Sequence, residues 1–557
     1  MKRSTHYIRL VIVGVFFTLI LAVIIWRVLD LMVFNRQFLK NQGDARSVRT
    51  IEIPAYRGMI TDRNGVPLAI STQVESVWVN PKVFKPSKAK LLKLSKILHV
   101  QVKFFNSLDK KYKNKEFVYL SRQLSPAIAS KVRDLNIKGV NFQQEYKRYY
   151  PQLESSAQVV GFTNIDDKGI EGMELAYQDW LRGENGKKKV IKDRMGRVVE
   201  EIQVIKSPRA GRDVALSIDS RIQYLAYNAL VKTCKKFEAK SGSVVVVDTQ
   251  TGEVLAVVNY PSFNPNAREK YTKSDFRNRA IVDSFEPGSV MKPFSIASAL
   301  EVGHFNKDTV IDTRPGWMVV DKRVIKDIHN YGVLNVTEVL EKSSNVGVSK
   351  MVLTDPPSAL LNLLKGVHFG EHTESDYPGE SPGSLIDVRQ MSPFVHATVS
   401  FGYGLSVTAL QLAKAYLIFV NEGNLMPISM LRGQQTGAQE PVISKKTAKD
   451  MLTMLESVSL YGTARFAQIP GYRVAGKTGT ARIAGNNGYE DKRYIASFVG
   501  LAPVSNPKLI VVVVINEPSK QGYYGAVVAG PLFAEVMGES LRILNVPPDK
   551  PIAAAKV

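Results

Sequence analysis

The chain has 557 residues, of which 45% are apolar and 22% are charged. These proportions are typical of folded soluble proteins and exclude both a disordered protein and a polytopic membrane protein. The single cysteine, Cys234, excludes an intrachain disulfide framework and a cysteine-ligated metal site. The net charge of +23 is spread along the chain and is not gathered into one stripe with interleaved aromatic residues, so no nucleic-acid partner is predicted.

The N-terminal segment predicts a membrane anchor. Basic residues within the first nine positions precede an uncharged apolar run at 10–26. As a helix this run covers about 25 Å, and Arg27 can snorkel to extend it. Bulky residues come next in place of the small residues of a cleavage site, which predicts an uncleaved anchor. We expect a cytoplasmic tail at 1–9, a single transmembrane helix at 10–31, and export of the rest of the chain.

A Lys-rich region at 43–212 mixes short strand-like and helical runs. Within it, Asn64-Gly65 separates two apolar runs and predicts a β-hairpin. Lysines recur together with leucines and isoleucines over 82–98, which predicts an amphipathic helix with a solvated basic face. This region is expected to form a mixed α/β domain between the anchor and the C-terminal region.

The region 213–546 is predicted to be an α+β domain. Two pairs of strands lie near its two ends, and a long, mostly helical stretch at 289–469 separates them. Strands at both ends with helices between them predict an antiparallel sheet flanked by helices, with the site where helices meet the sheet. The residues at 547–557 are expected to form a tail. The predicted strands are 243–248, 253–259, 494–501 and 509–515.

Ser289 and Lys292 form the first candidate pair for catalysis. Ser289 follows Glu286-Pro-Gly and opens an apolar helical run, so it is expected in the first turn of a helix with Lys292 on the same face. A neutral amine within hydrogen-bond reach can take the hydroxyl proton, and burial favours the neutral amine. The helix N-terminus also favours the negative charge that develops during attack on a carbonyl.

The sequence Lys477-Thr478-Gly479-Thr480 is a second, strong signal. On a strand, the lysine and the glycine share one face, and the glycine leaves the backbone open to a substrate lying alongside as an extra strand. The lysine and the two threonine hydroxyls suit a terminal carboxylate. A third motif, Ser343-Ser344-Asn345, stands between two helical runs and is weak by itself.

Several other motifs carry no function in this interpretation. The spacing Ser-x-x-Lys also occurs at Ser87 and Ser107, without the same context. The sequence at 368–372 fits the zinc signature H-x-x-E-H, but glycines around it predict a loop in place of the helix that the signature needs. The sequence at 379–383 fits the hydrolase elbow G-x-S-x-G, but its proline lacks the N–H that the oxyanion requires.

The three motifs, in the order Ser289-x-x-Lys292, Ser343-Ser344-Asn345 and Lys477-Thr478-Gly479, resemble those of the penicillin-recognising serine transferases. The middle position, Ser344, departs from the Ser-Asp-Asn form but keeps the first and third residues. Segments 53–69, 150–161 and 169–174 resemble the pedestal domain of class B penicillin-binding proteins, and 342–347 and 402–411 resemble the septal, FtsI-type group known as penicillin-binding protein 3.

The resemblance implies a peptidoglycan D,D-transpeptidase of cell division, and it implies a role for each site residue. Ser289 would attack the penultimate D-Ala of a stem peptide, with Lys292 as its base and Ser343 as the relay to the leaving D-Ala. Asn345 would hold the substrate amide, and the N–H groups of Ser289 and Thr480 would form the oxyanion hole. Lys477, Thr478 and Thr480 would bind the terminal carboxylate beside Gly479.

The resemblance further implies a bacterial inner-membrane protein whose catalytic domain lies in the periplasm at the septum. A stem-peptide amine would complete a 4→3 cross-link without metal or organic cofactor, and β-lactams would acylate the same serine. An FtsW-type glycosyltransferase and other divisome proteins are the expected partners, because 43–212 holds no second catalytic block. The alternatives are an elongation-type transpeptidase, a D,D-carboxypeptidase or β-lactamase that releases the acyl group to water, and a non-catalytic division scaffold or sensor.

Overall fold

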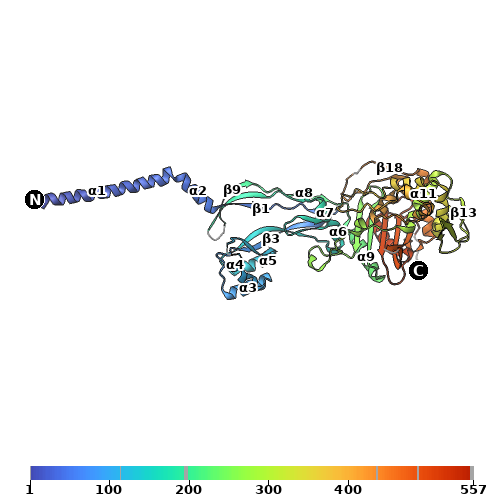
Figure 1. Cartoon of the computed structure of the whole chain (residues 1–557), viewed down its shortest axis with the longest axis horizontal. Coiled ribbons are helices and arrows are strands. Elements are labelled where there is room, and N and C mark those ends of the chain that lie inside the picture. Colours follow the sequence, from blue (N-terminus) through green and yellow to red (C-terminus); the bar gives the residue numbers. More distant parts are fainter. Residues whose placement is uncertain (1, 113, 194–197, 435–436, 486–487, 552–557) are drawn as a thin grey trace. The chain divides into compact units, whose positions relative to one another are not determined.

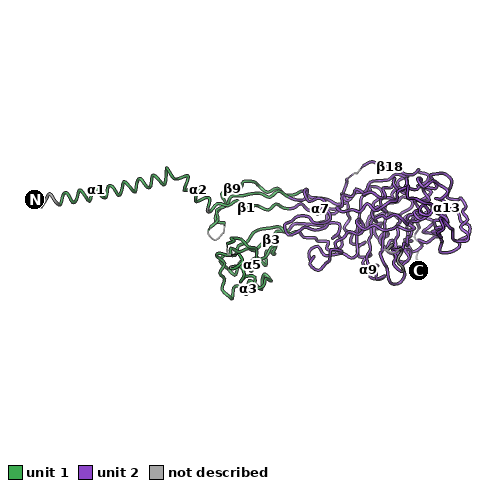
Figure 2. The backbone as a smooth tube through the Cα atoms, viewed as in Figure 1, with its two compact units in different colours: residues 1–56, 72–147, 183–211 green, residues 57–71, 148–182, 212–557 purple. Residues whose placement is uncertain are grey.

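The computed structural model of the chain describes residues 2–112, 114–193, 198–434, 437–485 and 488–551. Of the predicted C-terminal tail, 552–557 lie outside the described residues. The chain divides into two compact units, which Figure 2 shows in different colours. The N-terminal unit comprises Met1–Tyr56, Thr72–Lys147 and Gly183–Gly211, and the C-terminal unit comprises Arg57–Ser71, Arg148–Arg182 and Arg212–Val557.

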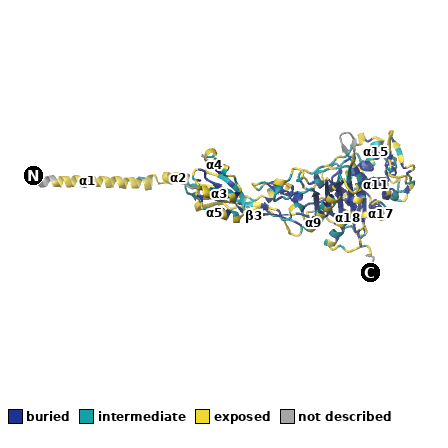
Figure 3. Ribbon diagram, turned by 90° about the horizontal axis from the view of Figure 1, so that it is seen from below, coloured by how far each residue is buried: buried dark blue, intermediate teal, exposed yellow. Residues whose placement is uncertain are grey.

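The chain begins with one long helix, α1 (Lys2–Leu29), which continues into a π-helical turn, Asp30–Phe34, and then α2 (Arg36–Ser47). Among the described residues, His6–Phe34 is the one helical stretch that is long and apolar enough to cross a membrane. Its large apolar side chains are exposed along its length, as the yellow ribbon of α1 in Figure 3 shows. A long helix with an uncharged apolar run at 10–26 that covers no protein core is the pattern of a membrane-spanning segment.

The N-terminal unit contains a three-stranded antiparallel sheet in the order β1-β8-β9. A small core lies between β4, β5, the C-terminal part of β3, and helices α3 to α5. Figure 1 shows these three helices grouped beside β3. The basic helix predicted over 82–98 begins later, at Lys88, because the Ser87 hydroxyl accepts from Lys90 N and caps it. The bounds are β1 (Val48–Ile53), β3 (Pro67–Val79), α3 (Lys88–Leu98), α4 (Val102–Lys111), β4 (Val118–Leu124), α5 (Pro126–Asp134), β5 (Val140–Tyr149), β8 (Gly186–Lys192) and β9 (Val198–Lys206).

The hairpin predicted at Asn64-Gly65 is confirmed. Strand β2 (Ile60–Thr61) pairs antiparallel with the start of β3, and Gly65 has a φ of +83° in the turn between them. A positive φ suits glycine, which has no Cβ to clash with the backbone. Strand β2 also pairs in parallel with β10 (Val214–Ala215), at the entry to the larger core of the C-terminal unit.

A buried charge cluster lies beside this hairpin, within the C-terminal unit. Glu174 accepts hydrogen bonds from Arg57 Nε at 2.7 Å and from Arg148 Nε at 2.6 Å. The three side chains are at most 1% exposed. Buried charges of this kind persist only when each is paired, so the cluster ties together three segments that are far apart in the sequence.

A five-stranded antiparallel sheet forms the centre of the C-terminal unit, in the order β12-β11-β21-β20-β19. All four predicted strands are confirmed, and β19 adds the edge strand that carries the Lys477 motif. Strands β11 and β21 are buried on both faces, which explains their continuous valine and isoleucine runs. The bounds are β11 (Ser241–Asp248), β12 (Val254–Tyr260), β19 (Ala475–Gly485), β20 (Gly488–Ala502) and β21 (Leu509–Asn516).

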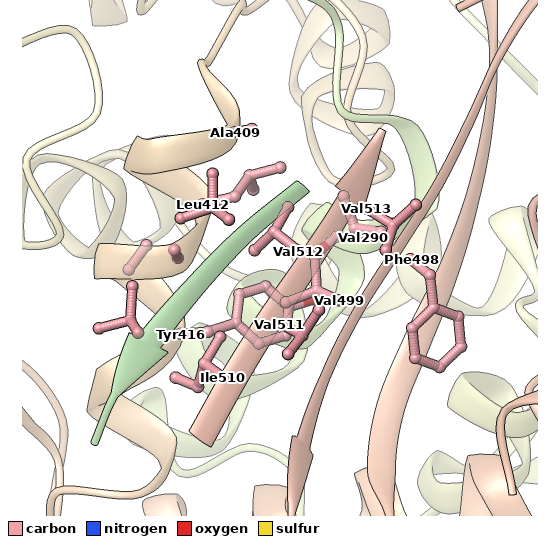
Figure 4. Packing of buried hydrophobic residues seen from close by; sticks show 14 of the residues in the cluster. Val290, Ala409, Leu412, Tyr416, Phe498, Val499, Ile510, Val511, Val512 and Val513 are labelled. Atoms are coloured by element: carbon pink, nitrogen blue, oxygen red, sulfur yellow. The ribbon is translucent and has the colours of Figure 1, made fainter. Parts of the chain in front are cut away.

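Helices cover both faces of this sheet. Helices α9 (Ser220–Lys236) and α18 (Gly525–Ile543) contact each other and pack against one face. Helix α16 (Ala409–Tyr416) packs against β11 and β21, where Figure 4 shows Leu412 and Tyr416 beside the sheet valines. The predicted α+β fold, an antiparallel sheet flanked by helices, is therefore confirmed, and it places the serine and lysine motifs at the edge of one core.

The stretch 289–469 is mostly helical, as predicted, but it also holds small two-stranded ladders that the sequence pattern did not indicate. One of them, β14 paired with β15, ends at the residue before Asp327, and β16 and α12 then lead to the Ser343 motif. The bounds are α11 (Lys292–Val302), β13 (Val310–Asp312), β14 (Trp317–Val320), β15 (Arg323–Lys326), β16 (Val333–Asn335), α12 (Val336–Lys342), α13 (Asn345–Thr354), α14 (Pro357–Gly366), α15 (Pro393–Val399) and α17 (Lys445–Leu460).

Candidate active site

Ser289 lies in a 3₁₀ turn, Gly288–Met291, that runs directly into α11. The prediction placed it in the first α-helical turn, and the structure places it one short turn earlier. Lys292 is the first residue of α11, where a 3₁₀ turn followed by a helix brings positions three apart onto one side. Tyr416 stabilises the turn, because its buried hydroxyl donates to Val290 O at 2.7 Å.

Strand β19 packs tightly against this serine turn, and Gly479 makes that approach possible. A Cβ atom at position 479 would lie 2.3 Å from Ser497 Oγ and 3.0 Å from Val290 Cγ1. Any side chain would push the strand away from the turn. The glycine therefore brings the Lys477 motif close to Ser289, in addition to the open backbone expected for it.

A chain of hydrogen bonds joins three of the predicted motifs. Lys292 Nζ lies 3.1 Å from Ser289 Oγ and donates to Ser343 Oγ at 3.0 Å and to Ser343 O at 2.5 Å. Lys477 Nζ donates to the same Ser343 Oγ, also at 3.0 Å. Lysines from helix α11 and strand β19 thus both contact the Ser343 hydroxyl, which lies in the turn before α13. Residues 289, 292 and 477 lie close together, as predicted.

Both lysine side chains are fully buried. Burial lowers the pKa of Lys292 to about 7, although the carboxylate of Asp327 acts in the opposite direction. Burial also lowers the pKa of Lys477 well below its usual value, and the nearby charge of Lys292 lowers it further. A buried amine without a carboxylate in direct contact favours its neutral form, which is the form that can accept a proton.

Ser343 occupies a strained position between two helices. It ends α12 in the left-handed region, with φ of 57° and ψ of 43°. Helix α12 begins with a capping box between Asn335 and Glu338, and α13 begins at Asn345 with Ser344 as its N-cap. A non-glycine residue in this region costs on the order of 1 kcal/mol, so the surrounding contacts must hold it there.

Asp327 supplies those contacts, and sequence reasoning missed it. Its carboxylate accepts from Ser344 Oγ at 2.5 Å and from the backbone N–H groups of Asn345 at 2.5 Å and Val346 at 3.0 Å. A carboxylate at a helix N-terminus satisfies free N–H groups and is stabilised by the helix dipole. No spacing rule connects position 327 to the motif at 343, because an intervening strand and helix bring them together.

The remaining predicted residues lie around this chain of hydrogen bonds without joining it. The Asn345 amide donates to Lys326 O at 3.1 Å. Thr478 Oγ1 lies 3.0 Å from Thr463 Oγ1, and Thr480 Oγ1 accepts from Gly525 N at 2.9 Å. On β19 the two threonines alternate with Lys477 and Gly479, as expected for a strand.

The Ser-x-x-Lys spacing at Ser87 and the zinc-like sequence at 368–372 lie outside this site. Ser87 caps α3, and Lys90 Nζ donates to Asn136 O in the N-terminal unit. The zinc-like sequence at 368–372 lies in turns after α14, so its two histidines do not share a helix face. Within the described residues no group of three or more His, Cys, Asp and Glu side chains is arranged to hold a metal ion.

The arrangement can activate a serine hydroxyl. A neutral Lys292 amine has two N–H bonds and one lone pair. The carbonyl and hydroxyl oxygens of Ser343 take the two N–H bonds, which leaves the lone pair for the Ser289 hydroxyl. The site therefore holds a hydroxyl, a buried amine and a second hydroxyl in the arrangement that acyl transfer through a serine ester requires.

Comparison with known families identifies the class. Residues 242–538 match the penicillin binding protein transpeptidase domain, and residues 52–216 match the penicillin-binding protein dimerisation domain. The chain belongs to the penicillin-binding protein transpeptidases, and its two domains in this order are those of class B members.

Full-length relatives give the group within that family. The chain is 44% identical to the probable peptidoglycan D,D-transpeptidase PbpC of Pseudomonas aeruginosa, over 99% of this chain and 97% of that protein. It is 40% identical to the peptidoglycan D,D-transpeptidase FtsI of Escherichia coli, over 95% and 91% of the respective chains. It is a peptidoglycan D,D-transpeptidase of the group that includes PbpC, PenA and FtsI.

Solved structures of related proteins have the same fold. A peptidoglycan synthetase from Bifidobacterium adolescentis matches with a TM-score of 0.72 at 25% identity, over 90% of this chain and 98% of that one. The transpeptidase domain of Burkholderia pseudomallei penicillin-binding protein 3 matches with a TM-score of 0.56 at 42% identity, over 60% and 98%. The expected fold, with a transpeptidase domain preceded by a dimerisation domain, is confirmed.

Proposed function

We propose that this enzyme cross-links peptidoglycan stem peptides at the division septum, with Ser289 as the nucleophile. The observation that carries the assignment of the site is the shared hydrogen-bond chain from Ser289 through Lys292 and Ser343 to Lys477. Support for the septal role comes from the similarity to FtsI over nearly the whole chain and from the motif at 342–347, which resembles the septal type.

Acylation depends on the positions of three side chains. The neutral amine of Lys292 accepts the Ser289 proton as Oγ attacks the carbonyl of the penultimate D-Ala. The N–H groups of Ser289 and Thr480 stabilise the oxyanion, and each such donor contributes about 100- to 1000-fold in rate. The proton then passes through Ser343 Oγ to the nitrogen of the departing D-Ala, and the ester on Ser289 remains for an acceptor amine.

The donor peptide is held between β19 and the turn at Ser343. Lys477 and the hydroxyls of Thr478 and Thr480 bind the terminal carboxylate, and the Asn345 amide binds a backbone group of the peptide. Because β19 is the edge strand of its sheet, no further strand pairs with its outer edge among the described residues, and an extended substrate pairs there beside Gly479.

The proposed domain organisation assigns membrane anchoring and catalysis to different parts of the chain. Residues 1–9 form a cytoplasmic tail, 10–31 anchor the chain in the bacterial inner membrane, 43–212 form the pedestal, and 213–546 form the periplasmic transpeptidase domain, with 547–557 as a tail. The long apolar helix at His6–Phe34 and the basic residues at the start of the chain support this orientation. An FtsW-type glycosyltransferase and other divisome proteins are the proposed partners, and β-lactams the expected inhibitors.

Labelled penicillin tests the site. We expect the full-length chain to retain the label on Ser289 for many minutes, and the Ser289→Ala variant to take up none. Rapid release of the label would identify a β-lactamase instead. Cells that depend on the Ser289→Ala variant should fail to divide and should form filaments. Normal septation in those cells would leave only a scaffold, and a fluorescent fusion spread along the side wall would contradict the septal role.

A further inference from the structure

The segment 82–115 of the N-terminal unit concentrates the positive charge of the chain. It contains eleven lysines and one acidic residue, Asp109, so its net charge is +10, out of +23 for the whole chain. It includes helices α3 and α4, which pack against each other over the small core of that unit. The expectation that the charge is spread along the chain is therefore corrected, because nearly half of it lies in this segment.

The lysines of these two helices lie on the side opposite to the core. Leu94 and Leu98 of α3 are buried in the core, as are Phe105 and Leu108 of α4. An amphipathic helix of this kind keeps its charged side chains in water. The exposed lysines, which we call the lysine surface, are Lys88, Lys90, Lys93 and Lys96 on α3 and Lys103 and Lys110 on α4.

This arrangement of charge opposes the stability of α3. Lys88 and Lys90 lie in the first turn of the helix, where the dipole favours acidic side chains, and that turn has none. Lys90 and Lys93 are three residues apart, which places like charges side by side. Among the described residues of 82–115, Lys82 is the one lysine with an ion pair, to Glu116. Cations that repel one another and have no acidic partner in the fold favour binding of an external anion.

The composition of the lysine surface indicates which anion fits. The segment 82–115 has no arginine, although protein interfaces and phosphate sites favour arginine and protein interfaces are poor in lysine. Leu92 is the one large apolar side chain of α3 that is exposed, whereas a helix that binds a membrane surface buries a whole apolar face in the lipid. Hydrated ammonium groups without apolar contacts suit a hydrated polymer that carries many carboxylates.

We propose that the lysine surface binds the peptidoglycan polymer itself, through the carboxylates of its stem peptides. The substrate of this enzyme is peptidoglycan, and each stem peptide that is not cross-linked ends in a carboxylate, so the polymer is a multivalent anion. Several weak contacts to one polymer strengthen one another, because every contact after the first is intramolecular. Binding of this kind raises the local concentration of stem peptides around the enzyme, and it does not depend on the septal role.

Co-sedimentation with purified sacculi tests the proposal. The full-length chain in non-ionic detergent is first acylated with penicillin, so that the active site is blocked and only binding elsewhere is measured. At 50 mM NaCl we expect a quadruple variant to bind about thirtyfold more weakly than the wild type, the effect of losing four exposed ion pairs of average strength. At 500 mM NaCl the two proteins should bind alike, because salt screens exposed charges. The variant carries Lys88→Gln, Lys93→Gln, Lys96→Gln and Lys103→Gln.

Three controls accompany this comparison. Sacculi whose carboxylates have been amidated should bind the wild type and the variant equally weakly. The thermal unfolding midpoint of the variant should not fall, because the substitutions remove repulsion within α3. A second quadruple variant removes the same charge from exposed positions of α9 and α17 and should bind like the wild type. It carries Lys232→Gln, Lys235→Gln, Lys446→Gln and Lys449→Gln.

Several outcomes would overturn the proposal. These are equal binding of the wild type and the first variant to untreated sacculi at 50 mM NaCl, an equal loss in the second variant, and undiminished binding of the wild type to amidated sacculi. In nanodiscs, an advantage of the wild type that is present with phosphatidylcholine and lost with phosphatidylglycerol would assign the lysine surface to anionic lipid. A chain that penicillin does not acylate would instead contradict the proposed function.

Discussion

Lys292 and Lys477 donate to the same acceptor, Oγ of Ser343, each at 3.0 Å. Two charged amines so close together, both fully buried, would repel each other without solvent to screen them. Burial lowers the pKa of each lysine, and the charge of Lys292 lowers that of Lys477 further. The arrangement keeps a base available near neutral pH.

The rate of acylation should depend on pH through Lys292. Its pKa of about 7 means that the amine is protonated, and inactive as a base, at lower pH. We expect the second-order rate constant for penicillin acylation to fall about tenfold per pH unit below this midpoint and to level off above it. A stopped-flow profile from pH 5 to 9 checks this, and a flat profile would rule out a titrating base.

Asp327→Asn should change both the rate and its pH dependence. The Asp327 carboxylate raises the pKa of Lys292, so its removal should move the acylation midpoint to lower pH. The substitution also weakens the contacts to Ser344 and Asn345 that hold Ser343 in its left-handed conformation, so the plateau rate should fall. Asp312→Asn, on an exposed ladder strand, is the control. A lower rate with an unmoved midpoint would leave Asp327 with a structural role alone.

Gly479→Ala should impair acylation by displacing β19 from the serine turn. The new Cβ would lie 3.0 Å from Val290 Cγ1 in that turn and 2.3 Å from Ser497 Oγ on the neighbouring strand β20, and overpacking of this kind costs about 1–3 kcal/mol. Ser497→Ala removes that oxygen and should restore part of the lost rate in the double variant. Gly43→Ala, where the added Cβ meets open space, is the matched control. Unchanged acylation in Gly479→Ala would show that the strand adjusts without cost.

Glu174→Ala should destabilise the C-terminal unit without touching the active site. It leaves the buried guanidinium groups of Arg57 and Arg148 without their shared carboxylate, and breaking a buried pair costs about 3–5 kcal/mol. Urea unfolding of the full chain in detergent should show a clearly lower midpoint. Glu116→Ala removes a pair with the exposed Lys82 and should cost less than about 1 kcal/mol. Equal midpoints for the two variants would contradict this account.

Sequence alone predicted the strands and turns that are determined by residues close together in the chain. Strands β11 and β21 of the central sheet arise from continuous runs of valine and isoleucine, and the hairpin at Asn64-Gly65 arises from its turn residues. The helix over 82–98 was predicted too long, because the Ser87 cap outweighed the lysine periodicity. The residues 289, 292, 343 and 477 could be singled out because their spacing and order are themselves the signal.

Tertiary structure decided what depends on distant segments. The low pKa of Lys292 arises from burial by surrounding elements, and the Asp327 contact depends on a ladder strand that shows no pattern in the sequence. The pairing of Arg57, Arg148 and Glu174 likewise joins segments more than 20 residues apart. Local spacing fixes which side chains a helix or strand presents together, whereas burial and long-range pairing are set only when the whole chain packs.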